Sequence, residues 1–184
     1  QARVRKGMGF VPQTQNIFTG MTVEENLEMG AFIRTDEAGI KETMDQIYGL
    51  FPILHQKRHQ AAGELSGGQR QQVAVGRALM TKPSVLLLDE PTAGVHPNLR
   101  RDIVQTLQRL RAQGISQLIV EHDMHFVREV CTRCVVLDRG QIVADCKPEE
   151  LSSHPQVIEA YLGRAAAELS TSAVSVHRAI HSLE

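Results

Sequence analysis

Near its middle the chain reads Val85-Leu86-Leu87-Leu88-Asp89-Glu90-Pro91-Thr92, four apolar residues followed at once by two acidic ones. A short run that is apolar throughout, instead of alternating, is typical of a strand covered on both faces in a parallel sheet. Ligands of such sheets bind beyond the carboxyl ends of the strands. The sequence therefore predicts an α/β fold in which Asp89 and Glu90 lie at a binding crevice.

A second apolar strand follows downstream and also ends in ionisable residues. Leu118-Ile119-Val120 runs directly into Glu121 and His122. A helical stripe lies between the two strands, made of Leu99, Ile103, Leu107 and Leu110. This order predicts a β-α-β unit, which brings the carboxyl ends of both strands to one edge of the sheet. We therefore expect both strand ends to face one crevice.

Two capping boxes mark where helices begin. One consists of Thr22 and Glu25, and the other of Ser66 and Gln69. In each, a hydroxyl residue stands three positions before Glu or Gln, so that the two residues satisfy each other's backbone amides. The second helix must end before Pro83, because proline cannot continue it.

The remaining periodicity predicts the other elements of the chain. In chain order they are a strand at 8–11 that stops at Pro12, helices at 23–34 and 37–50, a hairpin around 138–141 and a short helix at 155–162. Small residues accumulate near the end, so a frayed helix or a disordered tail is expected over 164–184.

Length and charge limit the class of protein. The 184 residues are 42% apolar and 22% charged, in the range of one globular domain with a sizeable core. Lys and Arg total 20 against 21 Asp and Glu, and neither sign forms a block, so nucleic acid is not expected as a partner. The apolar runs are far shorter than the ~20 residues that span a bilayer. The first residues carry no secretory signal and read as the middle of a longer chain.

Three cysteines, Cys131, Cys134 and Cys146, are too few for a disulfide framework, and a reducing cytoplasm is the simplest compartment. Cys131 and Cys134 form a C-x-x-C pair. There is no second pair and no His at zinc-finger spacing, so buried structural thiols are favoured over a zinc or redox site.

The acidic pair after the first strand has two interpretations. A carboxylate at Glu90 could accept a proton from an attacking water, which makes it the best general-base candidate. Acidic residues after strands also cap the next element, and on this pair alone that alternative is equally good.

A pair of glycines at a helix start supports the functional interpretation. Gly67 and Gly68 directly follow Ser66 of the second capping box. Glycines there lower helix stability, but they expose backbone amides at the positive end of the helix dipole and let a phosphate approach. The segment is therefore predicted to be an anion site.

Residues 65–69, Leu-Ser-Gly-Gly-Gln, are identical to the signature motif of ABC ATPases, and residues 85–92 resemble their Walker B segment at the usual close spacing. The resemblance covers Gly9 to about Gly163. It implies an α/β P-loop NTPase fold of the RecA-like type with a helical subdomain. On this basis we expect an incomplete ATPase core at 1–13 and 82–163, a helical subdomain at 14–81 and a C-terminal extension at 164–184.

The resemblance also implies a role for each residue of the crevice. Asp89 and Gln13 would hold Mg²⁺ against the nucleotide, directly or through water. Glu90 and His122 would be catalytic, and His122 would contact the γ-phosphate. ATP held by a second subunit would be bound by Ser66, Gly67, Gly68 and Gln69. Without the resemblance, His122 is a satisfied strand-end histidine or, with His125, a metal ligand.

The implied partners come from the same family. Two ATPase subunits would sandwich two ATP molecules, and the helical subdomain would dock on transmembrane permease subunits, with a substrate-binding protein acting indirectly. Candidate permease contacts are Phe18, Met21 and Val23. The protein would then lie in the cytoplasm, peripheral on the inner face of the plasma membrane.

Among subfamilies, residues 10–13, 21–27, 121–124 and 157–163 most resemble the ATPases of branched-chain amino acid importers. ATPases of lipid or lipopolysaccharide export are closely similar, and the nucleotide site does not distinguish the cargo. A DNA-repair or translation ATPase would carry coiled-coil insertions or a tandem ATPase, which this sequence lacks. A non-hydrolysing interaction module remains the third alternative.

The sequence departs from the family pattern in two places. No Gly is followed by Lys, so the P-loop G-x-x-x-x-G-K-[ST] is missing, and we expect a chain truncated before its first strands and its Walker A loop. Such a chain should bind and hydrolyse ATP poorly, and open sheet edges should lower its solubility. His96 stands where many members have Asp, which concerns communication across the dimer.

Overall fold

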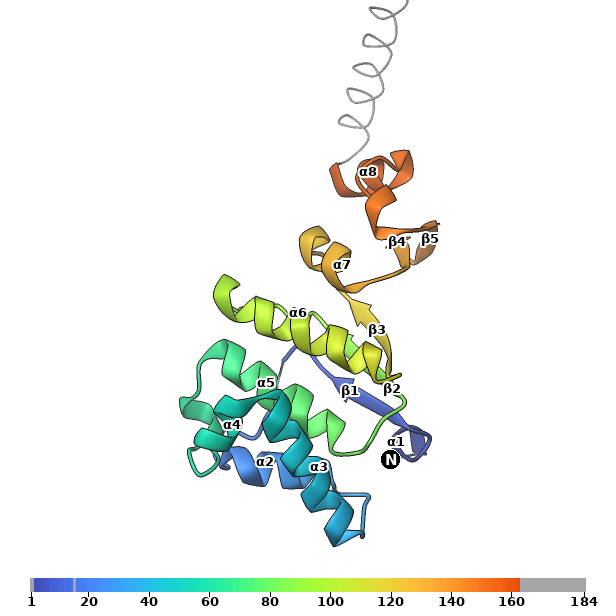
Figure 1. Ribbon diagram of the computed structural model, residues 1–184. Coiled ribbons are helices and arrows are strands. Elements are labelled where there is room, and N and C mark those ends of the chain that lie inside the picture. The colour runs from blue at the N-terminus through green and yellow to red at the C-terminus, as the bar shows by residue number, and fades with distance from the viewer. Residues whose placement is uncertain (1, 15, 163–184) are drawn as a thin grey trace, which may run out of the picture. The chain divides into compact units, whose positions relative to one another are not determined.

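The computed structural model describes residues 2–14 and 16–162, so the predicted tail at 164–184 lies outside the described residues. The described residues form two compact units, which divide between residues 122 and 123 (Figure 1).

A three-stranded parallel sheet organises the first unit. Strands β1 (Met8–Val11), β2 (Val85–Asp89) and β3 (Ser116–Val120) lie side by side in that order (Figure 1). The register sets Val11 opposite Leu88 and Leu88 opposite Ile119. The strands predicted from the sequence are confirmed, and their carboxyl ends share one edge.

Helices occupy the rest of the first unit. In chain order they are α1 (Ala2–Arg5), α2 (Val23–Gly30), α3 (Glu37–Leu50), α4 (Pro52–Gln56), a 3-10 turn (Ala62–Glu64), α5 (Gly67–Leu79) and α6 (Pro97–Ala112). Both predicted capping boxes form, at α2 and at α5. The short helix α4 was not predicted from the sequence.

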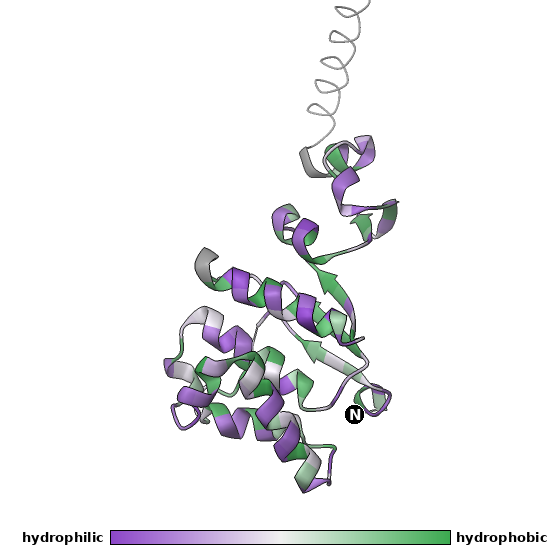
Figure 2. Cartoon of the chain, in the orientation of Figure 1, coloured by the Kyte–Doolittle hydropathy of each residue, from purple (hydrophilic) through white to green (hydrophobic). Residues whose placement is uncertain are grey.

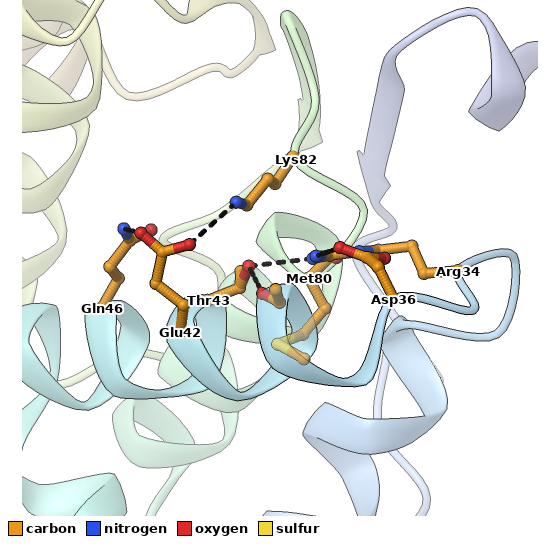
Figure 3. A network of polar contacts seen from close by, with 8 residues as sticks. Arg34, Asp36, Glu42, Thr43, Gln46, Met80 and Lys82 are labelled. Carbon is orange, nitrogen blue, oxygen red and sulfur yellow. Dashed lines mark hydrogen bonds and ion pairs between the residues drawn. The ribbon is translucent and has the colours of Figure 1, made fainter.

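The predicted extension of α2 to Arg34 is wrong, since the helix ends at Gly30. Arg34 has another role there (Figure 3): its guanidinium donates to Thr43 Oγ1 at 2.8 Å and to the Met80 carbonyl at 3.0 Å, and pairs with Asp36 at 2.6 Å. These bonds tie the start of α3 to the end of α5. The chain must leave the helix to place the guanidinium in this network.

The sheet has one covered and one open face. Val11, Leu86 and Leu88 point to the covered face and are almost completely buried, with α5 against β1 and Gln117 of β3 donating to the Leu107 carbonyl of α6. Figure 2 shows β1 and β3 coloured as hydrophobic toward their carboxyl ends. On the other face Phe10, Leu118 and Val120 are 58%, 61% and 58% exposed.

The prediction that β2 is covered on both faces is therefore wrong for this chain. Leu86 and Leu88 are buried, whereas Val85 and Leu87, which alternate with them along the strand, are only half-buried. The exposed face of the strand is also apolar, which is why the sequence indicated two covered faces. Apolar residues show that a strand face can be buried, but they do not show whether another segment covers it.

The second unit is a small αβ assembly around a hairpin. It contains α7 (Met124–Val130), β4 (Cys134–Asp138), β5 (Gln141–Cys146), a 3-10 turn (Pro148–Glu150) and α8 (Pro155–Leu162). Arg139 and Gly140 at the turn have φ of 47° and 80°, as a two-residue hairpin connection requires. The predicted hairpin and the predicted helix at 155–162 are both confirmed.

Candidate functional site

The carboxyl edge of the sheet gathers three side chains from three strand ends. Gln13, Glu90 and His122 follow β1, β2 and β3. Gln13 Nε2 donates to Glu90 Oε2 at 2.6 Å, and His122 Nδ1 lies 3.7 Å from Glu90 Oε1. Asp89, the last residue of β2, is half-buried and directly precedes Glu90. The structure thus brings three of the predicted crevice residues into direct contact around one carboxylate.

The backbone at Glu90 is held in an unusual conformation. Its φ of 42° lies in the left-handed region, which costs a non-glycine residue on the order of 1 kcal/mol or more. Its amide donates to the Val120 carbonyl at 2.9 Å, and its carbonyl accepts from Ala93 at 3.0 Å. The neighbouring strand and the following turn therefore impose the conformation that turns the carboxylate toward Gln13 and His122.

The buried carboxylate of Glu121 stabilises this arrangement through hydrogen bonds to two neighbouring segments. The side chain of Glu121 is 1% exposed, and its Oε1 accepts from Thr92 Oγ1 at 2.5 Å and from the Thr92 amide at 3.2 Å. Its Oε2 accepts from the His122 amide at 3.1 Å. Glu121 therefore joins the loop after β2 to the residue that contacts Glu90.

The sequence predicts Glu121 at the crevice but indicates no role for it. A signal was present, because a glutamate that directly follows an apolar strand of a parallel sheet needs hydrogen-bond donors if it is buried. The register that pairs Asp89 with Val120 places the loop after β2 beside Glu121. Only tertiary structure shows that Thr92 supplies these donors.

The N-terminus of α5 carries the glycine pair. Ser66 Oγ accepts from the Gln69 amide at 3.3 Å, and Gln69 Oε1 accepts from the Ser66 amide at 3.2 Å. The first amides of a helix have no partner within it, so those of Gly67 and Gly68 remain available to an anion. No acidic residue stands in the first turn of α5. The residues of the predicted anion site, 66–69, thus lie at a capped helix end that carries no acidic residue in its first turn.

Gly68 also has a packing reason that the sequence did not show. A Cβ atom added there would lie 2.6 Å from Leu99 Cδ1 and 2.8 Å from Leu99 Cβ. At Gly67 the nearest atom would be the Gly94 carbonyl oxygen at 3.0 Å. The loop after β2 and the start of α6 therefore press against the glycine pair. Glycine at position 68 is therefore needed for the packing of α5 against α6, whether or not a ligand binds there.

The segment after Gln13 is attached to α2 and α5 by buried polar contacts. Asn26 of α2 is fully buried; its Oδ1 accepts from the Phe18 amide at 2.7 Å, and its Nδ2 donates to the Phe18 carbonyl at 2.9 Å and to the Thr22 carbonyl at 2.8 Å. Arg77 of α5 lies over the Phe18 ring, 4.9 Å from its centre.

This packing corrects one of the predicted permease contacts. Val23 is completely buried, so it cannot meet a partner surface. Phe18 is 45% exposed and Met21 is half-buried, which leaves these two as candidates.

The fit of the crevice to a divalent cation depends on a small donor set. Among the described residues, no group of three or more His, Cys, Asp or Glu side chains forms a metal site. The candidate ligands Gln13 and Asp89 supply oxygen atoms, which Mg²⁺ prefers, and Mg²⁺ typically takes one or two protein ligands beside nucleotide phosphates and water.

Within the described part of the chain, no helix has the length and hydrophobicity needed to cross a membrane.

Comparison with known families gives two matches. The family described as "ABC transporter" matches residues 1–93. The family described as "Branched-chain amino acid ATP-binding cassette transporter" matches residues 141–167.

Relatives among characterised proteins agree with these matches. The high-affinity branched-chain amino acid transport ATP-binding protein BraG of Pseudomonas aeruginosa is 40% identical over 87% of this chain and 68% of its own length. The lipopolysaccharide export system ATP-binding protein LptB of Haemophilus influenzae is 37% identical over 88% and 67%. The glutamine transport ATP-binding protein GlnQ of Geobacillus stearothermophilus is 35% identical over 84% and 64%. The chain thus spans about two thirds of the length of these relatives.

Solved structures show the same fold. The ADP conformation of MJ1267, an ATP-binding cassette of an ABC transporter, superposes with a TM-score of 0.77 at 34% identity, over 89% of this chain and 71% of that one. A dimeric post-hydrolysis state of the cassette MJ0796, bound to ADP and Pi, gives 0.68 at 25% identity, over 80% and 66%. These likenesses confirm the fold class predicted from the sequence.

Proposed function

Because the chain belongs to the family of ABC transporter ATP-binding proteins, we propose that it forms most of the ATPase subunit of an importer of branched-chain amino acids. The match of residues 141–167 to the branched-chain amino acid family carries the choice of cargo. That region lies in the second unit, outside the crevice residues that all members of an ATPase family need. The likeness to BraG points the same way.

Export of lipopolysaccharide is the second candidate, because LptB is only slightly less similar than BraG. The two functions predict different losses in the source cell. Removal of the subunit should abolish high-affinity uptake of labelled leucine, isoleucine and valine and leave lipopolysaccharide at the cell surface unchanged. Unchanged uptake together with lost lipopolysaccharide would refute the import function.

The reaction we propose is hydrolysis of ATP, with Glu90 as the general base. Its carboxylate would accept a proton from the water that attacks the γ-phosphate. Gln13 and His122 contact the two carboxylate oxygens separately, at 2.6 and 3.7 Å, and so fix its orientation. Because the carboxylate is already oriented by contacts on both of its oxygens, it loses little conformational freedom when it accepts the proton, and the entropic cost of the step is lower.

Mg²⁺ would offset the developing charge on the phosphates. Asp89 and Gln13 would hold it, with the remaining ligands coming from phosphate and water. A glutamine amide has both a donor and an acceptor, so Gln13 can donate to Glu90 while its carbonyl oxygen faces the cation.

His122 would donate to the γ-phosphate, and Glu121 would hold its backbone in place. The buried Glu121 carboxylate accepts from the His122 amide and from Thr92, so the histidine and the loop after Glu90 share one anchor. Movement of that loop would therefore shift His122 and Glu90 together.

A second subunit completes the proposed site. Ser66, Gly67, Gly68 and Gln69 would present the uncompensated N-terminus of α5 to ATP bound by the partner. The dimeric MJ0796 structure supports this assembly. Phe18, which is 45% exposed, would contact a transmembrane permease subunit, and the protein would then lie at the membrane surface.

The decisive experiment replaces the general base in the complete subunit, with a P-loop upstream of residue 1. Glu90→Gln keeps the shape and loses the basicity, so ATP hydrolysis should fall by ~10²- to 10⁴-fold while MgATP binding persists. Glu37→Gln, at an exposed position in the first turn of α3, is the matched control and should hydrolyse normally. Undiminished hydrolysis by Glu90→Gln would rule out this mechanism.

A further inference from the structure

The second unit contains a pair of thiols that the proposed transport function does not use. Cys134 begins β4 and Cys146 ends β5, and the register sets them directly opposite each other in the antiparallel ladder. Opposite residues in such a ladder have their side chains on the same face and their Cα atoms about 4.5–5.5 Å apart. A disulfide needs Cα atoms about 4.4–6.8 Å apart. The register of the ladder is therefore compatible with a disulfide.

The surroundings favour a pair of thiols over a metal site. Cys134 lies with Ala144, Leu151 and Val157 in the apolar core of the second unit, and Cys131 and Cys146 pack against it. None of the three cysteines is in a disulfide. No group of three or more ligating side chains in the described part of the chain is arranged for a metal ion.

The two thiols differ in accessibility. Cys134 is buried, and burial, together with the nearby Cys131 and Cys146, raises its pKa to about 11. Cys146 is half-buried, so a small reagent reaches it first. Burial also raises the pKa of Cys146. A thiol of raised pKa reacts slowly, which suits a bond that forms only under sustained oxidation.

We propose that Cys134 and Cys146 form a reversible cross-strand disulfide when the protein meets a low-molecular-weight disulfide such as oxidised glutathione. The Cys146 thiolate attacks one sulfur of the small disulfide, a mixed S–S bond forms, and one small thiol leaves. The Cys134 thiolate then attacks the Cys146 sulfur and releases the second small thiol. The protein loses two electrons and two protons, and the small disulfide gains both.

The bond would close the hairpin at the end opposite its turn. Arg139 and Gly140 connect the strands at one end, and the disulfide would join them at the other. Bidentate pairing of Arg133 with Asp145 already holds this end at 2.5 and 2.8 Å. A covalent link there restricts the unfolded chain, so thermal unfolding of the oxidised protein should shift upward by about 5 °C.

The test incubates the folded, purified chain with oxidised glutathione, blocks the remaining thiols by alkylation and maps the peptides by mass spectrometry. We expect a loss of two hydrogen atoms, a cross-linked peptide joining residues 134 and 146, an alkylated Cys131, and recovery of the Cys134 and Cys146 thiols when the cross-linked peptide is reduced. A link that involves Cys131, mixed glutathione adducts alone, or a link between two chains would overturn the proposal.

Two variants separate the pair from its neighbour. Cys131→Ser should form the same cross-link in the same yield, because residue 131 lies outside the ladder. Cys146→Ser should form no internal link, and a circular dichroism spectrum equal to that of the unaltered chain shows that it still folds. An internal cross-link in Cys146→Ser would also contradict the assignment.

Discussion

Helices α2 and α5 both begin with a capping box, but the residue that closes the box is a carboxylate in one and an amide in the other. In α2, Glu25 Oε2 accepts from the Thr22 amide at 2.7 Å and from its hydroxyl at 3.0 Å. In α5, Gln69 accepts from the Ser66 amide. The first turn of α2 contains Glu24 and Glu25, whereas that of α5 contains no acidic residue.

This difference decides what each helix end can do. Two carboxylates compensate the positive end of the α2 dipole, so that end has no affinity left for an anion. The neutral cap of α5 satisfies the same orphan amides and leaves the dipole uncompensated. One local motif therefore gives a structural helix start in α2 and a candidate phosphate site in α5.

The largest expected effect concerns α2, whose role in this comparison is structural. Asn26→Leu removes the buried side chain that holds Phe18 and Thr22, and takes away the acceptor of the Phe18 amide. We expect a loss of about 3 kcal/mol in the free energy of unfolding, measured in urea. Gln46→Ala, which removes only an exposed bond to Glu42, is the control and should change little. An Asn26→Leu protein of undiminished stability would break the assignment of α2 as a structural element.

A smaller effect tests whether the α5 glycines serve packing as well as binding. In Gly68→Ala the new methyl would lie 2.6 Å from Leu99, so α6 must shift, and we expect a net loss of about 1–2 kcal/mol after the gain in helix propensity. Gly49→Ala in α3 meets nothing within 4 Å and should stabilise by about 0.5–1 kcal/mol. Equal effects in urea unfolding would show that the contact with Leu99 is not restrictive.

Both capping boxes could be predicted from the sequence, because each is a local pattern of four residues whose partners lie one turn apart. The strands could also be predicted, since apolar runs of three or four residues end at proline or at acidic residues. The same local reasoning placed Gln13, Glu90 and His122 at strand ends. Adjacency of these ends follows from the parallel order of the strands.

Contacts between segments distant in sequence could not be predicted. The role of Glu121 depends on Thr92, 29 positions away, and the close approach of Leu99 to Gly68 depends on how α6 packs. The end of α2 at Gly30 depends on Arg34 reaching Met80. In each case a tertiary contact overrides or supplements a local preference that by itself indicated something else.

The comparison becomes sharper when the caps are exchanged. Gln69→Glu gives α5 the carboxylate that α2 has, so the helix should stay capped, but phosphate binding at its end should weaken. In the complete subunit we expect ATP hydrolysis to fall by ~10-fold. Glu25→Gln in α2 is the reciprocal control, and it should leave hydrolysis unchanged. Equal hydrolysis by both variants would remove the electrostatic distinction between the two helix ends.

The smallest effect is a pH dependence that only one of the caps should show. Hydrogen bonds from the Thr22 amide and then from its hydroxyl hold the pKa of Glu25 below its ordinary value of 4.5. A carboxyl whose pKa is lower in the folded state contributes stability above its unfolded pKa, and loses it as the pH falls through the folded value. The stability difference between the unaltered chain and Glu25→Gln should therefore be present at neutral pH and shrink below 4.5. Because other carboxylates titrate in the same range, the measurement is that difference, followed by urea unfolding at several pH values. Gln69→Glu should acquire the same dependence at α5, and its absence there would mean that the two boxes are not equivalent in geometry.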